Sequence, residues 1–298
     1  MGYLFLGIAL LCGATKGYCG KKTSGCVQGY KDAMFANTIR MIFCILIGLG
    51  MILLDGSIND IVPSASLLAV SALSGITTSV FVVCWLISVK KGAYMMLDVF
   101  LMLGVLVPLL AGKLFFNESI KTTQWIGIGI LFIAVYIMCS YNNSIKGKMT
   151  ITSLILLIVC GVANGLTDFS QKLFMKMTGD TSIAIFNFYT YIFSTLTLLV
   201  FYCVFNRIEQ TDGEKNSTGI KRVFGYILVM SICLFANSYF KTMAAGYLDS
   251  AQIYPLNQGA SLIISSGMSA LLFGERLTLK CVIGLLVSFV GLIVLNVL

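Results

Sequence analysis

Phe273-Gly274-Glu275-Arg276-Leu277 is the stretch that decides the fold, because it is a short polar junction between two long apolar runs. The first run begins at Tyr247, and the second ends at Leu298. The same arrangement stands 157 positions earlier, at Phe116-Asn117-Glu118-Ser119-Ile120. The repeated junction predicts an internal duplication, with one copy near the end of each half.

A second repeated sequence pattern lies near the start of each half, at an offset of 148 positions. It places Cys12, Gly13 and Gly17 on Cys160, Gly161 and Gly165. The difference between the two offsets is absorbed by a longer polar connection at 206–222. We therefore divide the chain into two five-helix repeats, residues 1–145 and 146–298.

The composition indicates that most of the chain lies in lipid. The 298 residues are 58% hydrophobic and only 11% charged, with a mean hydropathy of +0.95. Soluble domains carry about 25% charged residues, so this charge cannot coat a globule of this size. The apolar runs approach or exceed the ~20 residues that a helix needs to cross a bilayer. Helix is the expected form, because lipid cannot satisfy a bare backbone and the runs lack the alternation of a membrane barrel.

Ten apolar runs are expected to cross the membrane. They are Tyr3–Gly20, Phe35–Leu54, Leu67–Val89, Ala93–Phe116, Trp125–Tyr141, Ile151–Phe174, Ile183–Phe205, Val223–Ala244, Ser250–Phe273 and Leu279–Leu298. Five spans per half is an odd number, so the second half must enter the membrane from the opposite face. The sequence thus predicts an all-α integral membrane protein with ten transmembrane helices in two inverted five-helix repeats. Many secondary transporters are built in this way, with the substrate near the midplane between the repeats.

Several other classes of protein are disfavoured. The connections are too short to hold an ATPase or a soluble catalytic domain, and histidine, the commonest catalytic base, is absent. The ten cysteines include no C-x-x-C pair, so we expect no metal, no cofactor and no enzymatic activity. The net charge of +8 is read as membrane orientation rather than nucleic-acid binding. Lys and Arg gather after the odd-numbered spans, which would put those connections, and not the termini, in the cytoplasm.

The two halves resemble the EamA-type drug/metabolite transporter superfamily. The Phe273 junction followed by Gly284 and Gly291 is similar to its C-terminal signature, and Phe116-Asn117-Glu118 with Gly127 is similar to the same signature in the first half. Gly165 with Gln171-Lys172 resembles the start of its second repeat. The resemblance implies an inverted-repeat bundle whose central cavity moves small organic molecules. It also implies cytoplasmic termini, against the distribution of Lys and Arg, so the orientation stays open.

Polar side chains within the spans are the candidate substrate site, because charge in the bilayer should face a partner or a wet cavity. The candidates for substrate binding are Tyr94, Asp98, Asn164, Asp168, Gln171, Tyr254, Asn257 and Gln258. Lys16 and Lys172 are candidate charge partners. The polar candidates within 151–174 share one helical face, and the polar candidates within 250–273 also share one face. Trp85, Asn237 and Lys241 are weaker candidates for the same wall.

Each candidate also has a structural interpretation. Asp168 and Lys172 could simply neutralise each other, and the side chains on 250–273 could be interhelical hydrogen bonds. Lys16 could pair with Asp98, bind an anionic substrate or extend to the interface, as is expected of Arg40. Pro108 and Pro255 are expected to interrupt equivalent helices beside the site. Glu118 and Glu275 are expected to be turn residues at opposite membrane faces, or else to form a gating ion pair.

From these features we expect a multi-pass protein of the cell (plasma) membrane. It would be a secondary transporter of small polar or amphipathic organic metabolites, exporter or importer, with alternating access around a central cavity. The alternative is a flippase for lipids or lipid precursors on the same bundle. The expected partners are a small-molecule substrate and the lipid bilayer, with a coupling proton or ion as a further candidate, and no nucleic acid.

Overall fold

The computed structural model describes residues 1–27, 29–90, 94–139, 151–178, 181–208, 223–273 and 279–297. Within these ranges the chain is helical and contains no strand. The helices are α1 (Gly2–Ser24), α2 (Tyr30–Leu54), η1 (Ser57–Asp60), α3 (Ala65–Lys90), α4 (Tyr94–Gly104), α5 (Leu106–Phe116), α6 (Thr122–Cys139), α7 (Ile151–Met177), α8 (Ile183–Ile208), α10 (Phe224–Tyr247), α11 (Ser250–Phe273) and α12 (Leu279–Val297). Helices α4 and α5 follow each other in one span, so the described residues form the ten predicted spans.

The outer surface of the bundle is apolar. Among the described residues, six helices are long and apolar enough to cross a membrane: α1, α2, α3, α7, α8 and α10. Shorter apolar stretches lie at Phe100–Phe116, Thr122–Ala134 and Val282–Val294. Large apolar side chains such as Leu53 and Phe289 are exposed on the outside. An apolar surface of this extent suits lipid rather than water, which confirms the integral membrane class.

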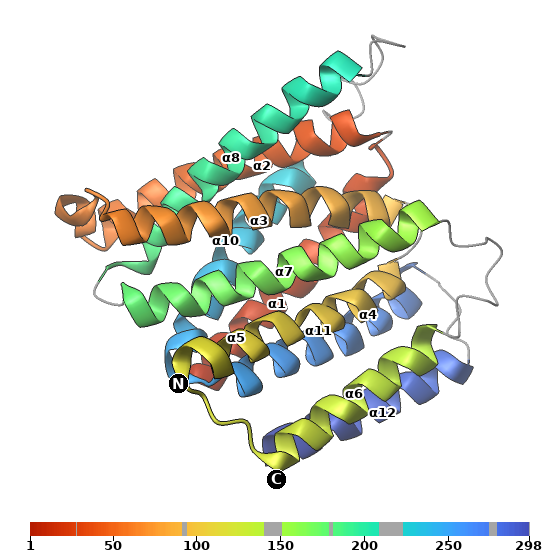
Figure 1. Ribbon diagram of the computed structural model, residues 1–298. Helices are drawn as coiled ribbons and strands as arrows, with labels where there is room; N and C mark the ends of the chain where they lie inside the picture. The colour runs from red at the N-terminus through yellow and green to blue at the C-terminus, as the bar shows by residue number, and fades with distance from the viewer. Residues whose placement is uncertain are drawn as a thin grey trace.

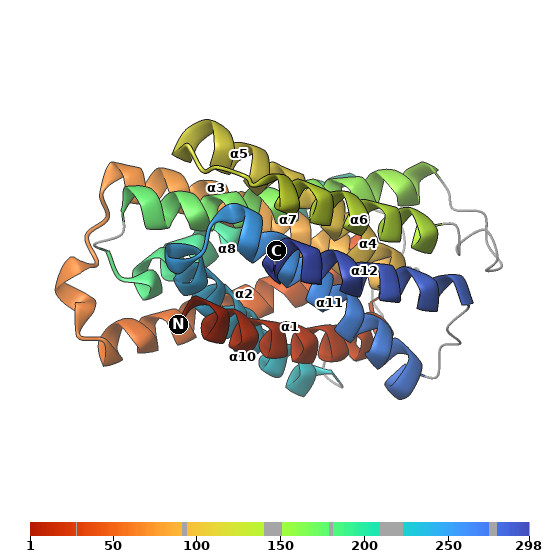
Figure 2. The ribbon, with the colours of Figure 1, turned by 90° about the horizontal axis from the view of Figure 1, so that it is seen from below.

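The spans run back and forth between two ends of the bundle (Figures 1 and 2). Both chain termini lie at the same end, as an even number of spans requires. The connection from α5 to α6, which contains Glu118, lies at this end, whereas α11 ends and α12 begins at the other. Glu275 lies outside the described residues. The two junctions nevertheless fall at opposite ends, as inverted repeats predict.

The helix contacts are symmetric under exchange of the two halves. Helix α1 packs against α10, and its counterpart α7 packs against α3, the counterpart of α10. Three further pairs join each helix to its own counterpart: α2 with α8, α4 with α11, and α6 with α12. Such a pattern is expected of two repeats related by a pseudo-two-fold axis.

The fourth span breaks where it crosses α7. Helix α4 ends at Gly104, and α5 begins at Leu106. Pro108 has no N–H for the Gly104 carbonyl, which weakens the helix at this point. A Cβ at Gly104 would overlap the carbonyl oxygen of Gly161, and one at Gly161 would overlap that of Phe100. Glycine at these positions therefore lets the two backbones touch.

The interruption predicted at Pro108 is confirmed, but the one predicted at Pro255 is wrong. Helix α11 is continuous from Ser250 to Phe273 with Pro255 inside it. Pro255 lies in the second turn, so the carbonyl deprived of its donor belongs to the first turn. The helix therefore tolerates this proline without a break.

Candidate functional site

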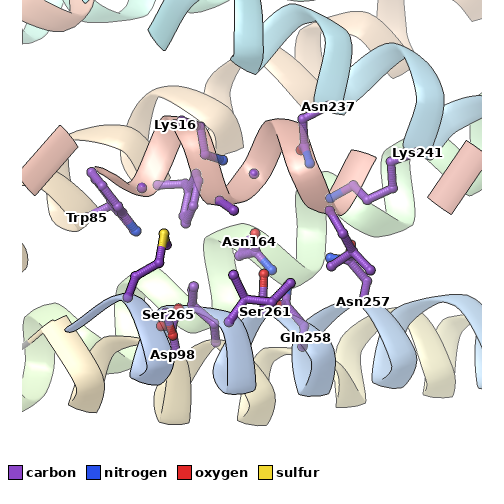
Figure 3. A pocket seen from close by; sticks show the side chains of 18 residues that line it. Lys16, Trp85, Asp98, Asn164, Asn237, Lys241, Asn257, Gln258, Ser261 and Ser265 are labelled. Atoms are coloured by element: carbon purple, nitrogen blue, oxygen red, sulfur yellow. The ribbon is translucent and has the colours of Figure 1, made fainter. Parts of the chain in front are cut away.

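A cavity lies in the middle of the bundle, between helices of both repeats (Figure 3). It encloses about 630 Å³ of empty space, with its open mouth included. Six helices line it: α1, α3 and α4 from the first half, and α7, α10 and α11 from the second. Its polar side chains are Lys16, Asp98, Asn164, Asn237, Lys241, Asn257, Gln258, Ser261 and Ser265.

The rest of the wall is apolar or made of small residues. Phe81 and Trp85 of α3 form one side, and Ile264 and Met268 of α11 form another. Gly13 and Gly17 of α1 bring the backbone to the surface of the cavity. A cavity of mixed character, with a few convergent polar groups, is typical of a site for a small organic molecule.

Two charged groups on the wall have no counter-ion within the described residues. The carboxylate of Asp98 is 8% exposed, and its Oδ2 atom has no hydrogen-bond partner there. Ser265 lies close enough to interact with this carboxylate. The Lys16 ammonium lies 5.8 Å from the centre of the Phe81 ring, at a distance suited to a cation–π contact. Figure 3 places Lys16 and Asp98 on opposite sides of the cavity.

Asp168 is fully buried and pairs with Lys241 of α10 rather than with Lys172. The Lys241 ammonium donates a hydrogen bond to the Asp168 carboxylate. Lys241 lines the cavity, whereas Asp168 lies behind it. The alternative in which Asp168 and Lys172 neutralise each other does not hold in the structure. Helical spacing shows which residues share a face but not which helix packs there.

Lys172 lies in a separate cluster at the end of the bundle that holds the termini. Its Nζ atom is 3.0 Å from Glu118 Oε1, and it donates to the carbonyls of Ala245 and Leu248 at 3.1 and 2.6 Å. The other carboxylate oxygen of Glu118 accepts a 2.9 Å hydrogen bond from the backbone N–H of Ser250. Lys172 therefore binds the C-terminus of α10, and Glu118 the N-terminus of α11. Both groups complement the helix dipoles.

The remaining predicted residues divide between the cavity and the packing around it. Asn164, Asn257 and Gln258 line the cavity, as predicted for the polar faces of α7 and α11. Tyr254 is fully buried outside it and donates to the backbone carbonyl of Asp168 at 2.7 Å. Gln171 donates to the Ser238 hydroxyl at 3.2 Å, also outside the cavity. The side chain of Tyr94 lies outside the described residues.

One feature of the site and one of the packing around it escaped the sequence reasoning. Ser265 and Met268 continue the stripe of Asn257, Gln258 and Ser261 along α11, so the same helical spacing, carried two more turns, would have found them. Arg40 does not extend to the interface: it is 3% exposed and donates to the Asn37 side chain at 3.1 Å. The reason is that α2 begins at Tyr30, which places Arg40 in the third turn.

The comparisons with known proteins identify the family. The model of the EamA-like transporter family matches residues 1–140 and again residues 151–297. The chain belongs to the EamA-like transporter family. As an EamA-like protein it is a multi-pass membrane protein of the drug/metabolite transporter superfamily, which the resemblance of the two junctions predicted.

Structure comparison agrees with this fold. A solved structure described as "Crystal structure of protein" has a TM-score of 0.73 at 11% sequence identity, over 99% of this chain and 96% of that one. At this identity the likeness concerns the fold alone. No significant match was found among curated proteins.

Proposed function

We propose that this EamA-like protein is a secondary transporter that moves small polar or amphipathic organic metabolites through the central cavity. The observation that carries the proposal is the position and lining of that cavity. It lies between the two repeats, and polar atoms of Asp98, Asn164 and Asn257 face it or its wall without a hydrogen-bond partner in the described part of the chain. Buried polar atoms are normally satisfied, so atoms left free in a cavity are suited to a ligand or water.

The proposed mechanism is alternating access around this site. The Glu118–Lys172 cluster ties α5, α7, α10 and α11 together at the end with the termini. The lining residues of α11 run from Asn257 toward the opposite end of that helix. We interpret this conformation as closed at the end with the termini and accessible from the other. Transport would require the cluster to separate while the opposite end closes.

The wider proposal follows from the family and the fold. The repeats are residues 1–145 and 146–298, and the energy comes from a solute or ion gradient across the cell membrane rather than from an enzymatic reaction of this chain. A proton or another ion is the proposed coupling partner. Asn164, Asn257 and Gln258 would bind substrate, and Asp168 would hold Lys241 in position at the wall.

The test is counterflow in proteoliposomes. The purified protein is reconstituted into liposomes, and each batch of liposomes is loaded with one member of a library of polar metabolites. Uptake of the same solute in labelled form is followed with and without a proton gradient. A parallel set of vesicles carries fluorescent phospholipids, whose movement between leaflets is measured. Solute exchange without lipid movement supports the proposal. Lipid movement without exchange of any solute would instead identify a flippase.

A further inference from the structure

The position of Trp85 on the cavity wall depends on a glycine of the neighbouring helix. The side chain of Trp85 lines the cavity and is 6% exposed. The far edge of its indole ring, atoms Cζ3 and Cη2, lies against Gly20 of α1, so close that a Cβ at this position would overlap both atoms. Glycine therefore leaves room for the ring that alanine would fill.

Trp85 lies at the end of the cavity that is farther from the chain termini. Figure 3 places it at one end of the cavity and Lys241 at the other. Gly20, Trp85 and Met268 all lie in the last two turns of their helices, α1, α3 and α11, which finish at the end of the bundle opposite the termini (Figure 1). This is the end that the proposed transport function takes as open.

Space into which the ring can move lies on the side of the cavity. The cavity encloses about 630 Å³ with its mouth included, and Trp85 is part of its wall. A methyl group on α1 would need about 3.5–4.0 Å from the ring carbons. A side chain at position 20 would therefore push the indole ring into the cavity and narrow it near the mouth.

The other end of the cavity is built differently. At the repeat offsets, Gly20 corresponds to Asp168 and Trp85 to Thr242. Asp168 and Thr242 are fully buried, and Asp168 is paired with Lys241. The wall is thus fixed by an ion pair at one end and by the packing of a ring on a glycine at the other.

We infer that Trp85 limits the size of the solute that passes the mouth of the cavity, and that Gly20 is a positioning residue that lets the ring stay clear of it. This inference rests on the proposed transport function and names a determinant of substrate size. The effect is steric, so it acts on solutes of any charge. A methyl group at position 20 narrows the mouth without contacting the solute, and a smaller side chain at position 85 widens it.

The width of the mouth can be measured without a known substrate. Ser261 lines the cavity about two turns deeper along α11 than Met268, so a Ser261→Cys variant carries a thiol behind the ring. The purified protein is treated with aminoethyl methanethiosulfonate or with trimethylammonioethyl methanethiosulfonate, which has the same charge and a larger head group. The rate of thiol modification is measured for each reagent. The same chain with Ser261 intact gives the background from the native cysteines.

Gly20→Ala is expected to slow the larger reagent by at least about tenfold and the smaller reagent by less, because the larger one must displace the ring against the added methyl group. Trp85→Ala, with Gly20 intact, should raise the rate of the larger reagent. Phenylalanine lacks the two indole atoms that meet position 20, so Trp85→Phe should restore the rate in the Gly20→Ala chain. Gly7→Ala is the matched control on α1, where a Cβ meets nothing within 4 Å, and should change neither rate.

The same variants are then compared in the counterflow assay and by fluorescence. The largest library solute that is exchanged should be smaller for Gly20→Ala and larger for Trp85→Ala than for the unmodified protein. In the Trp125→Phe background Trp85 is the one tryptophan that remains. Its emission should shift on Gly20→Ala and stay the same on Gly7→Ala.

The outcomes separate this inference from the transporter proposal. An equal effect of Gly20→Ala on both reagents, or no rescue by Trp85→Phe, would show that the added methyl group distorts α1 and would overturn the inference. An unchanged size limit in the counterflow assay would overturn it as well. If no solute is exchanged by any chain, the transporter proposal fails, and the reagent rates alone decide whether the ring limits the mouth. If Gly20→Ala does not fold, Trp85→Ala decides, since an unchanged rate of the larger reagent in that variant contradicts a mouth limited by the ring.

Discussion

Lys172 of the second repeat and Glu118 of the first form a buried ion pair, with Nζ and Oε1 3.0 Å apart. The side chains are 3% and 7% exposed. The pair is not isolated, because Lys172 also binds two carbonyls at the end of α10 and Glu118 binds the first N–H of α11. The cluster therefore fixes three helix ends relative to α7.

Glu118→Gln is expected to destabilise the protein by about 3–5 kcal/mol, the cost typical of removing one partner from a buried pair. Glutamine keeps the shape but leaves the Lys172 charge without its partner. Denaturant unfolding of the purified protein in detergent measures the change. Asp60→Asn, an exposed carboxylate in η1, is the control. Equal stability of the two variants would contradict the importance of the pair.

The contribution of Glu118 should also depend on pH. Burial raises the pKa of this carboxyl. Hydrogen bonds from Ser250 and Lys172, together with the lysine charge, lower the pKa by more than burial raises it, so the pKa lies below its usual value. A carboxyl whose pKa is lower in the folded state stabilises the fold above its unfolded pKa of about 4.3. This stabilisation is lost as the pH falls through the folded value. The difference between wild type and Glu118→Gln should be full at neutral pH and shrink below about pH 4.3; a difference that grew with acid would contradict it.

Asp168 and Lys241 should behave as a coupled pair. Asp168→Asn leaves a buried ammonium unpaired, and Lys241→Met leaves a buried carboxylate unpaired, so each single variant should lose stability. The double variant removes both charges and should be more stable than the sum of the single effects, with a coupling of about 0.5–3 kcal/mol. Unfolding free energies of the four proteins measure it. Additive effects would show that the two groups do not stabilise each other.

Gly161→Ala should destabilise the crossing of α4 and α7 by about 1–3 kcal/mol, as overpacking does elsewhere. The added Cβ would overlap the carbonyl of Phe100. Gly267→Ala is the matched control in α11, where a Cβ meets nothing within 4 Å. There alanine should be neutral or slightly stabilising, because it favours the helix. The melting temperatures of both variants, measured by thermal unfolding, test this prediction. Equal melting temperatures would argue against the close approach of the α4 and α7 backbones.

Tryptophan fluorescence should report occupancy of the cavity. The chain has two tryptophans: Trp85 lines the cavity, and Trp125 of α6 is 40% exposed on the outside. A solute that exchanges in the counterflow assay should change the emission of the Trp125→Phe variant and leave that of Trp85→Phe unchanged. The reverse result would place the bound solute away from α3.

Much of the fold could be predicted from the sequence, because lipid restricts a bare backbone to helices and the junctions at Phe116 and Phe273 revealed the repeat. The inversion then followed from the odd number of spans in each half. The side-chain partners could not be predicted in this way. Helical spacing placed Asp168 and Lys172 on one face, but their partners, Lys241 and Glu118, come from elements distant in the sequence. The break at Gly104 likewise depends on the backbone of α7.

The glycine crossing has a consequence for the symmetry of the two halves. At the repeat offsets, Gly161 corresponds to Gly13 and Gly104 to Ser261. Gly104 and Gly161 lie backbone to backbone, whereas their counterparts Ser261 and Gly13 both face the cavity. The cavity thus lies where the symmetry-related crossing, that of α1 with α11, would be. Ser261 carries the Cβ that has no room at Gly104, so the α1–α11 contact cannot close as tightly as that of α4 and α7. The two halves therefore differ in shape at this crossing, although their helices pack in the same pattern.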